Sequence, residues 1–299
     1  MTHPGPHCQG CALYIPPPIS TRAKILSMTW PWDHGYHTVN DVIAVLVDLG
    51  ATEVSIRTPE YMRTSDMPST NSYNPAFNKA LVTAARAKGM LVSLWPIVSL
   101  FDPLKMAAAV KKEVELYKPV RVVLDIEGAW IANYGKNTMP FLQALGNVGV
   151  PVGLGSYRRP SLHSEIRWQD WLRTQVDGKY VIGFQAAQMY PIGWMRPESW
   201  VYQFRLDIDS HEAQHIAAGR PDLPWLPWLP AFAEGLDPYG KLWYPRIEGV
   251  KAAVEYMEGR LGSRLLGLNW WSLDQDLIVR GTIVDPRFTD LYVYIKSKT

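Results

Sequence analysis

Two carboxylates stand two residues apart in the apolar segment VLDIE, at residues 123–127. If this segment is a β-strand, Asp125 and Glu127 point to the same face and lie about 6–7 Å apart along the strand. Two neighbouring carboxyls do not both ionise freely, so the one in the drier environment has a raised pKa and is able to act as a general acid. The same spacing also suits an Asp that caps the next helix beside a Glu paired with an arginine. Acid catalysis and a structural ion pair are therefore the alternatives.

A third carboxylate, Glu234, and several aromatic and amide side chains follow other apolar runs. Aromatic faces stack on pyranose rings, and paired carboxyls cleave glycosidic bonds. If Glu127 works with Glu234, a separation of about 5–5.5 Å would give retention of configuration and about 6.5–9.5 Å would give inversion. No histidine spacing typical of a metal site accompanies these residues, so we assign no metal ligand. The residues expected to bind substrate are Tyr190, Trp271, Gln188, Arg57, Tyr157, Asn269 and Trp95.

The elements that must position these residues alternate between short apolar runs and amphipathic runs. The count and length match a single α/β domain of the (β/α)8 TIM-barrel type, in which active-site residues follow the C-terminal ends of the strands. A doubly wound open sheet is the alternative, but no strand is followed by G-x-G-x-x-G or a Walker-type loop. Strands are expected at residues 23–30, 52–58, 90–98, 121–127, 150–157, 180–190, 226–234 and 265–272. Helices are expected at residues 39–49, 76–88, 139–147, 161–175 and 246–261 and after Asp102-Pro103, whereas residues 197–220 show no clean pattern.

Composition narrows the class of protein. The 299 residues are 47% hydrophobic and include 13 Trp and 15 Tyr, which excludes an intrinsically disordered chain. A formal net charge of +2 without a long Lys/Arg run gives no footprint for nucleic acid. No apolar stretch reaches the ~18 residues of a membrane span, and the first residues lack a secretory leader pattern. We expect a soluble protein, either cytoplasmic, or phage-borne or released to a cell wall by another route.

Residues 1–22 are rich in Pro and Gly and predict an irregular arm before a barrel over residues 23–299. The arm holds one C-x-x-C pair, Cys8 and Cys11, beside His7, which suits either a metal site or a loosely docked arm. The WLPWLP repeat at residues 225–230 either lines a sugar cleft or packs around a strand. Arg158 and Arg159 either meet an acidic group of a substrate or are solvated surface charges.

Three predicted strand ends resemble motifs of glycoside hydrolase family 18, the chitinase-like enzymes. The sequence LDIE at residues 124–127 resembles the D-x-E that ends strand 4 of that family. The sequence GLNWWSLD at residues 267–274 resembles its strand 8 pattern, G-x-M-x-W-x-L-D, and QMY at residues 188–190 resembles M-x-Y-D of strand 6. The strand 4 motif of family 25 lysozymes is also D-x-E, and their P-x-G-x-Y resembles residues 151–157.

The resemblance implies roles for single residues. Glu127 would be the general acid, and Asp125 would orient the 2-acetamido group whose oxygen attacks the anomeric carbon. Trp271 would floor the sugar subsite, and Tyr190 would contact the acetamido group. The chain departs from family 18 because Val123 and Pro191 replace two Asp residues and the S-x-G-G motif of strand 3 is absent. It also lacks the first-strand D-x-S of family 25.

Together, residues and resemblance predict a barrel glycoside hydrolase. The expected partner is a polysaccharide that contains N-acetylated amino sugars, such as peptidoglycan or a chitin-like glycan, and no cofactor is required. The alternative is a non-catalytic carbohydrate-binding or cell-wall-binding barrel. Retention of Glu127 favours the enzyme.

Overall fold

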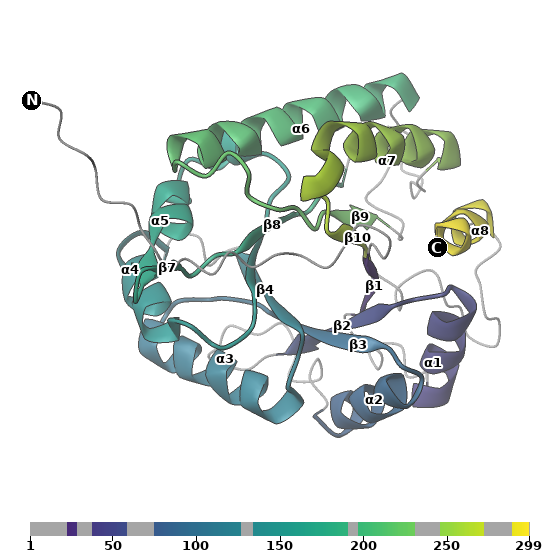
Figure 1. Cartoon of the computed structure of the whole chain (residues 1–299), viewed down its shortest axis with the longest axis horizontal. Helices are drawn as coiled ribbons and strands as arrows, with labels where there is room; N and C mark the ends of the chain where they lie inside the picture. The colour runs from purple at the N-terminus through teal and green to yellow at the C-terminus, as the bar shows by residue number, and fades with distance from the viewer. Residues whose placement is uncertain are drawn as a thin grey trace, which may run out of the picture.

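Eight parallel strands surround the centre of the molecule in this computed structural model (Figure 1). The structure describes residues 23–28, 38–58, 75–126, 134–190, 197–230, 246–271 and 289–298, with the backbone alone for 23–28, 134, 197 and 271. The predicted arm at residues 1–22, with Cys8 and Cys11, lies outside the described residues. The strands are β1 (Ala23–Met28), β2 (Glu53–Thr58), β3 (Leu91–Pro96), β4 (Arg121–Ile126), β5 (Val152–Ser156), β8 (Phe184–Ala187), β9 (Trp228–Pro230) and β10 (Gly267–Trp271).

The sheet closes on itself. Its order is β8-β5-β4-β3-β2-β1-β10-β9, and every neighbouring pair is parallel. The two ends of this order are joined by parallel bridges, Gln185 with Trp225 and Gln188 with Trp228. The backbone N–H of Met189 also donates to the carbonyl of Trp228 at 2.8 Å. These bonds make a barrel, which removes the exposed sheet edges that an open sheet would leave.

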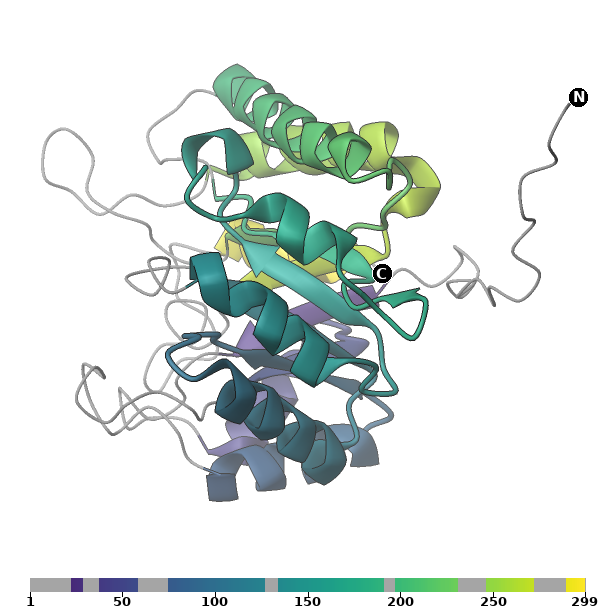
Figure 2. The ribbon, with the colours of Figure 1, turned by 90° about the vertical axis from the view of Figure 1, so that its left-hand side faces the viewer.

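One helix follows each barrel strand in the described part of the chain. The predicted (β/α)8 barrel is therefore confirmed. In both views α6 and α7 lie side by side on one side of the strands, and α1, α2 and α3 lie on the opposite side (Figures 1 and 2). The helices are α1 (Val39–Asp48), α2 (Pro75–Ala87), α3 (Pro103–Tyr117), α4 (Tyr134–Leu145), α5 (Trp168–Arg173), α6 (Pro197–Ala217), α7 (Ile247–Leu261) and α8 (Thr289–Ser297). A short antiparallel hairpin, β6 (Gln175–Val176) and β7 (Lys179–Tyr180), lies outside the barrel sheet.

Local sequence signals fix several helix starts. The Thr38 side chain accepts a hydrogen bond from the Asp41 N–H at 3.2 Å, and the Asp41 carboxylate accepts one from the Thr38 N–H at 2.9 Å. This capping box satisfies two N–H groups that the first turn of α1 would otherwise leave unpaired. Asp102 caps α3 in the same manner by accepting from the Lys105 N–H at 3.1 Å, with Pro103 as the first helical residue.

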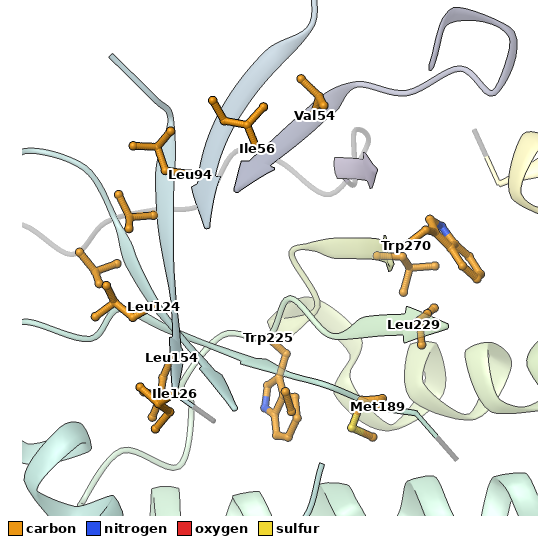
Figure 3. Close-up of a cluster of buried hydrophobic side chains, with 14 of the residues drawn as sticks. Val54, Ile56, Leu94, Leu124, Ile126, Leu154, Met189, Trp225, Leu229 and Trp270 are labelled. Carbon is orange, nitrogen blue, oxygen red and sulfur yellow. The ribbon is translucent and has the colours of Figure 1, made fainter. Parts of the chain in front are cut away.

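Two hydrophobic layers hold the barrel together. The larger cluster lies between strands and helices, and Figure 3 shows members of it from neighbouring strands, among them Val54, Leu94 and Leu124. The smaller cluster fills the barrel interior and consists of Trp95, Val123, Phe184, Ala186, Leu226 and Trp228. Where one strand contributes to both clusters, as β4 does with Val123 and Leu124, neighbouring residues belong to different clusters because side chains two apart on a strand share a face. This alternation decides which polar side chains reach the interior.

The glycines of β5 make room inside the barrel. A Cβ on Gly153 would lie 2.2 Å from the ring of Phe184, which is closer than any packing allows. Gly153 therefore lets the Phe184 ring occupy interior space that a larger residue on β5 would take. At the same end of the barrel the fully buried Glu53 carboxylate lies 3.0 Å from the guanidinium of Arg121. Burial raises the pKa of Glu53, and Arg121 and the Ser93 hydroxyl offset part of that rise.

Several predicted boundaries were wrong. Within residues 197–220, for which no element was predicted, Pro197–Ala217 form the 21-residue helix α6. The predicted strand over residues 180–190 begins only at Phe184, because Tyr180 pairs within the β6–β7 hairpin. Helix α4 begins at Tyr134 rather than at residue 139 and contains Pro140. The predicted helix over residues 161–175 is a 3₁₀ turn at Pro160–Leu162 followed by the six residues of α5.

Candidate functional site

Asp125 lies inside the barrel, one residue before the C-terminal end of β4. Its neighbours Leu124 and Ile126 belong to the outer cluster, whereas Val123 belongs to the interior cluster, so Asp125 shares the interior face. Its side chain is fully buried. The backbone N–H of Val98, just after β3, donates to the carbonyl of Asp125 at 2.9 Å and fixes the strand end. Asp125 is therefore a carboxylate shielded from solvent, and it lies at the end of the barrel where such folds place their active sites.

Gln188 reaches Asp125 across an intervening strand. Its side-chain Nε2 donates to Asp125 Oδ1 at 3.2 Å, although β5 separates β4 from β8 in the sheet. On β5, Gly155 pairs with Asp125 on one side and with Ala186 on the other. A Cβ at this position would lie 3.0 Å from both Val123 Cγ1 and the Leu124 carbonyl. The lack of a side chain at Gly155 therefore lets β5 pack closely against Val123 and the backbone of β4 beside Asp125.

Two indole rings lie in the interior that Asp125 shares. Trp95 and Trp228 make an edge-to-face contact with ring centroids 4.9 Å apart. The Arg57 guanidinium lies over the Trp95 ring at 5.3 Å from its centroid, and Tyr190 packs against the same interior cluster. The structure thus brings the predicted residues Trp95, Arg57 and Tyr190 to one interior surface.

Trp228 was not among the predicted site residues, although the WLPWLP repeat was one signal for it. In the structure Leu226 and Trp228 belong to the interior cluster, while Trp225 and Leu229 belong to the outer cluster. The repeat therefore contributes side chains to both hydrophobic clusters, as expected of a segment that packs around a strand, whereas the predicted role in a sugar cleft stays a prediction. Asn269 pairs in register with Trp228 and is buried, between the outer-cluster residues Leu268 and Trp270. Asn269 therefore faces the interior as well.

Four predicted site residues are not placed in the interior by the described part of the structure. Glu127 directly follows the last residue of β4 but lies outside the described residues, as does Glu234. Trp271 is the last residue of β10, and its backbone alone is described. Tyr157 follows β5, and its ring stacks on the His163 ring with centroids 3.7 Å apart. Tyr157 packs against the outer cluster rather than the interior one.

Arg158 and Arg159 are not solvated surface charges, because both guanidinium groups face the carboxylate of Asp207. Arg159 Nε donates to Asp207 Oδ1 at 2.7 Å, and Arg158 Nε lies 3.8 Å from Asp207 Oδ2. Burial raises the pKa of Asp207 to about 6, because the two arginines offset only part of the cost of burying its charge. Sequence patterns do not reveal this partner, because Asp207 lies in α6, which was not predicted as a helix.

Two histidines of α6 are buried beside this ion pair. Burial lowers the pKa of His211 to about 3 and that of His215 to about 2. Both imidazoles are therefore neutral over the physiological range. Among the described residues, no three His, Cys, Asp or Glu side chains cluster as metal ligands. No described helix is long and apolar enough to cross a membrane.

A cavity of about 320 Å³ opens at the opposite end of the barrel. It is lined by residues that precede or begin the strands, among them Val120, Arg121, Val150, Gly183 and Leu266. Barrels of this kind carry out chemistry at the C-terminal strand ends, and the N-terminal face contributes to stability. We therefore separate this cavity from the candidate site around Asp125 and Gln188.

The sequence matches no protein-family model and no curated protein sequence. Solved structures do match in fold. A β-1,4-mannanase of family GH113 superposes with a TM-score of 0.58 at 11% identity, covering 92% of this chain and 97% of that one. A chitinase from Bacteroides thetaiotaomicron gives 0.57 at 12% identity, with 86% and 91% covered.

An endo-β-N-acetylglucosaminidase from Cordyceps militaris gives a TM-score of 0.57 at 14% identity, with 92% of this chain and 90% of that chain covered. That protein was solved in complex with fucosyl-N-acetylglucosamine-Asn, with an Asp and a Glu two positions apart replaced by Asn and Gln. These likenesses concern the path of the backbone. The chain therefore has the barrel fold of several glycoside hydrolases.

Proposed function

We propose that this protein is a glycoside hydrolase in which residues 23–299 form the catalytic barrel. The observation that carries the proposal is the buried Asp125 carboxylate, bonded to Gln188 at the C-terminal end of the barrel and two residues before Glu127. A buried carboxylate held by an amide, with a second carboxylate next to it in the chain, is suited to acid catalysis on a glycosidic bond.

In this proposal Glu127 protonates the leaving glycosidic oxygen. Asp125 orients the 2-acetamido group of the sugar, whose oxygen attacks the anomeric carbon as the bond to the leaving oxygen breaks. Gln188 keeps the Asp125 carboxylate in place, while Tyr190 and Trp271 hold the reacting sugar. Arg57, Trp95 and Asn269 complete the proposed set of substrate-binding residues, without Tyr157, which packs against the outer cluster. These residues need no cofactor for the reaction.

The proposed substrate is a polysaccharide that contains N-acetylated amino sugars, as in chitin-like glycans or peptidoglycan. Only such sugars carry the acetamido oxygen that this mechanism uses as the nucleophile. The roles proposed for Asp125 and Glu127 therefore favour N-acetylated substrates. The fungal endo-β-N-acetylglucosaminidase supports this choice, because its Asp and Glu have the same spacing and its bound molecule contains N-acetylglucosamine.

The test is release of reducing ends from N-acetylglucosamine oligomers and from purified peptidoglycan. We expect release by the wild type and a loss of about 10²-fold or more in Glu127→Gln. Asp125→Asn should also lose activity, and Glu165→Gln, on the exposed loop after β5, is the control that should retain it. Equal release by the wild type and Glu127→Gln, with loss in Glu234→Gln, would move the acid role to Glu234. Binding without release would instead indicate a carbohydrate-binding barrel.

A further inference from the structure

Helix α6 presents a polar buried face to the segment after β5. His211 Nε2 lies 3.2 Å from the carbonyl of Tyr157, and the Ser161 N–H donates to Ser210 Oγ at 3.0 Å. About two turns earlier on α6, Gln203 Oε1 accepts a hydrogen bond from Arg159 Nη2 at 2.8 Å. The α6 residues in these contacts recur at the spacing of a single helix face. This face therefore holds residues 157–161, which continue directly from β5 at the mouth of the barrel.

Asp207 lies in the middle of that face and extends the contact to the next barrel strand. Its two oxygens meet Arg159 and Arg158, and Arg158 Nη1 also donates to the backbone carbonyl of Tyr190 at 3.2 Å. Tyr190 comes shortly after β8, two residues beyond Gln188. Arg158 thus spans the mouth from α6 to the strand end that carries both Gln188 and Tyr190.

The surroundings of Asp207 make its charge costly to keep. The side chain is about 1% exposed, and the cations facing it are Arg158 and Arg159 from the segment after β5. His211, one turn later on α6, is neutral because burial holds its pKa near 3. The pKa of Asp207 is about 6, so the carboxylate takes up a proton in mildly acidic solution. A neutral Asp207 attracts the two guanidinium groups far less strongly.

We propose that Asp207 is a positioning residue for the candidate site: through Arg158 it holds the backbone of Tyr190, and so sets the place of the Tyr190 ring against the interior cluster. The effect of Asp207 on sugar binding rests on the proposed function. Its effect on the position of Tyr190 is independent of that function. Protonation of Asp207 releases Arg158 and loosens the Tyr190 backbone, which makes substrate binding weaker below about pH 6.

The first test is kinetic and uses Asp207→Asn, which keeps the shape and removes the charge. We expect KM for N-acetylglucosamine oligomers to rise about tenfold at pH 7.5, with kcat changed less than about threefold. The wild type should show the same rise in KM as the pH falls below about 6, and the variant should not. Asp209→Asn is the matched control, because Asp209 lies two residues along α6 and pairs with Arg205 and Arg260 at the surface.

A second measurement does not depend on activity. With 3-fluorotyrosine placed at position 190, the ¹⁹F resonance of the wild type should shift with a midpoint near pH 6, and Asp207→Asn should abolish that shift. Arg158→Met should also abolish it while leaving the Arg159–Asp207 pair, which keeps the test valid if Asp207→Asn fails to fold. If the pH-dependent shift persists in folded Arg158→Met, the proposal is overturned. A wild type that shifts near pH 6 yet releases no sugar would contradict the glycosidase function and leave the positioning role standing.

Discussion

Gln188 donates a hydrogen bond to Asp125 although 63 residues and one whole strand separate them. The bond crosses β5 at the level of Gly155, where no side chain intervenes. It joins an amide that has no net charge to a carboxylate that is fully buried. Such a donor orients the carboxylate without neutralising it, which suits a group that must align a substrate amide.

Replacing Gln188 by Leu should therefore lower kcat strongly while changing the free energy of unfolding only slightly. The variant loses the side-chain donor to Asp125, and a misplaced positioning group costs about 10- to 100-fold in rate. Since Gln188 is only half-buried, we expect the free energy of unfolding to change by less than about 1 kcal/mol. Steady-state kinetics on N-acetylglucosamine oligomers, together with urea unfolding, measure both quantities.

Gln185→Leu is the matched control, three residues earlier on the outer face of the same strand. Gln185 donates to the Leu154 carbonyl at 2.8 Å and contacts His215, and it is fully buried. Its loss should cost about 1–3 kcal/mol of stability, because it leaves buried polar groups unpaired. Its kcat should stay near the wild-type value. A Gln188→Leu variant with normal kcat would show that the hydrogen bond to Asp125 has no catalytic consequence.

Much of the barrel could be predicted from the sequence because its signals are local. The capping box at Thr38 and Asp41 acts within four residues, and the apolar runs of the strands repeat around the barrel. Helix α6 could not be predicted in this way. Its inward face carries Asp207, His211 and His215 in place of apolar residues, so the sequence lacks the periodicity that marks a buried helix. Their partners, Arg159, Tyr157 and Gln185, lie elsewhere in the chain.

The candidate site was predictable in part for the same reason. Parallel strands place their C-terminal ends together, so the sequence could assign Asp125 and Gln188 to one end of a barrel. It could not show that the two side chains touch, because they are 63 residues apart and come from strand ends that are not neighbours in the sheet. The inward direction of Trp228 was also hidden, since the WLPWLP repeat alternates between the two faces of β9.

The interior packing predicts a stability cost at Gly153. In Gly153→Ala the new methyl group would meet the Phe184 ring at 2.2 Å, so Phe184 would have to leave its place in the interior cluster. We expect the free energy of unfolding to fall by about 1–3 kcal/mol, the usual cost of overpacking. Gly259→Ala is the control, because a Cβ there on α7 meets nothing within 4 Å. That variant should gain about 0.5–1 kcal/mol from reduced chain entropy. Equal unfolding midpoints for the two variants in urea would contradict the interior packing.

The buried histidines predict that stability falls in acid. Because the folded-state pKa values of His211 and His215 are about 3 and 2, both rings stay neutral in the folded protein while they gain protons in the unfolded chain below about pH 6.5. The stability that this difference contributes is full above pH 6.5 and is lost as the pH falls, at up to about 1.4 kcal/mol per pH unit for each ring. Asp207 acts in the opposite direction, since its raised pKa of about 6 stabilises the folded state at low pH and loses that effect as the pH rises through 6.

Glu53, whose pKa is also raised by burial, acts in the same direction as Asp207, so glutamine substitutions are needed to isolate the contribution of the histidines. A Gln at both positions is able to donate to the carbonyl of Tyr157 and to Gln185 Oε1 without taking up a proton. The double variant His211→Gln/His215→Gln should be less stable than the wild type at pH 7.5 but should lose less stability down to pH 4.5, so that the two curves of unfolding free energy converge. If the curves of the double variant and the wild type run parallel, the two imidazoles take up protons in the folded protein as readily as in the unfolded chain, and burial on α6 does not keep them neutral.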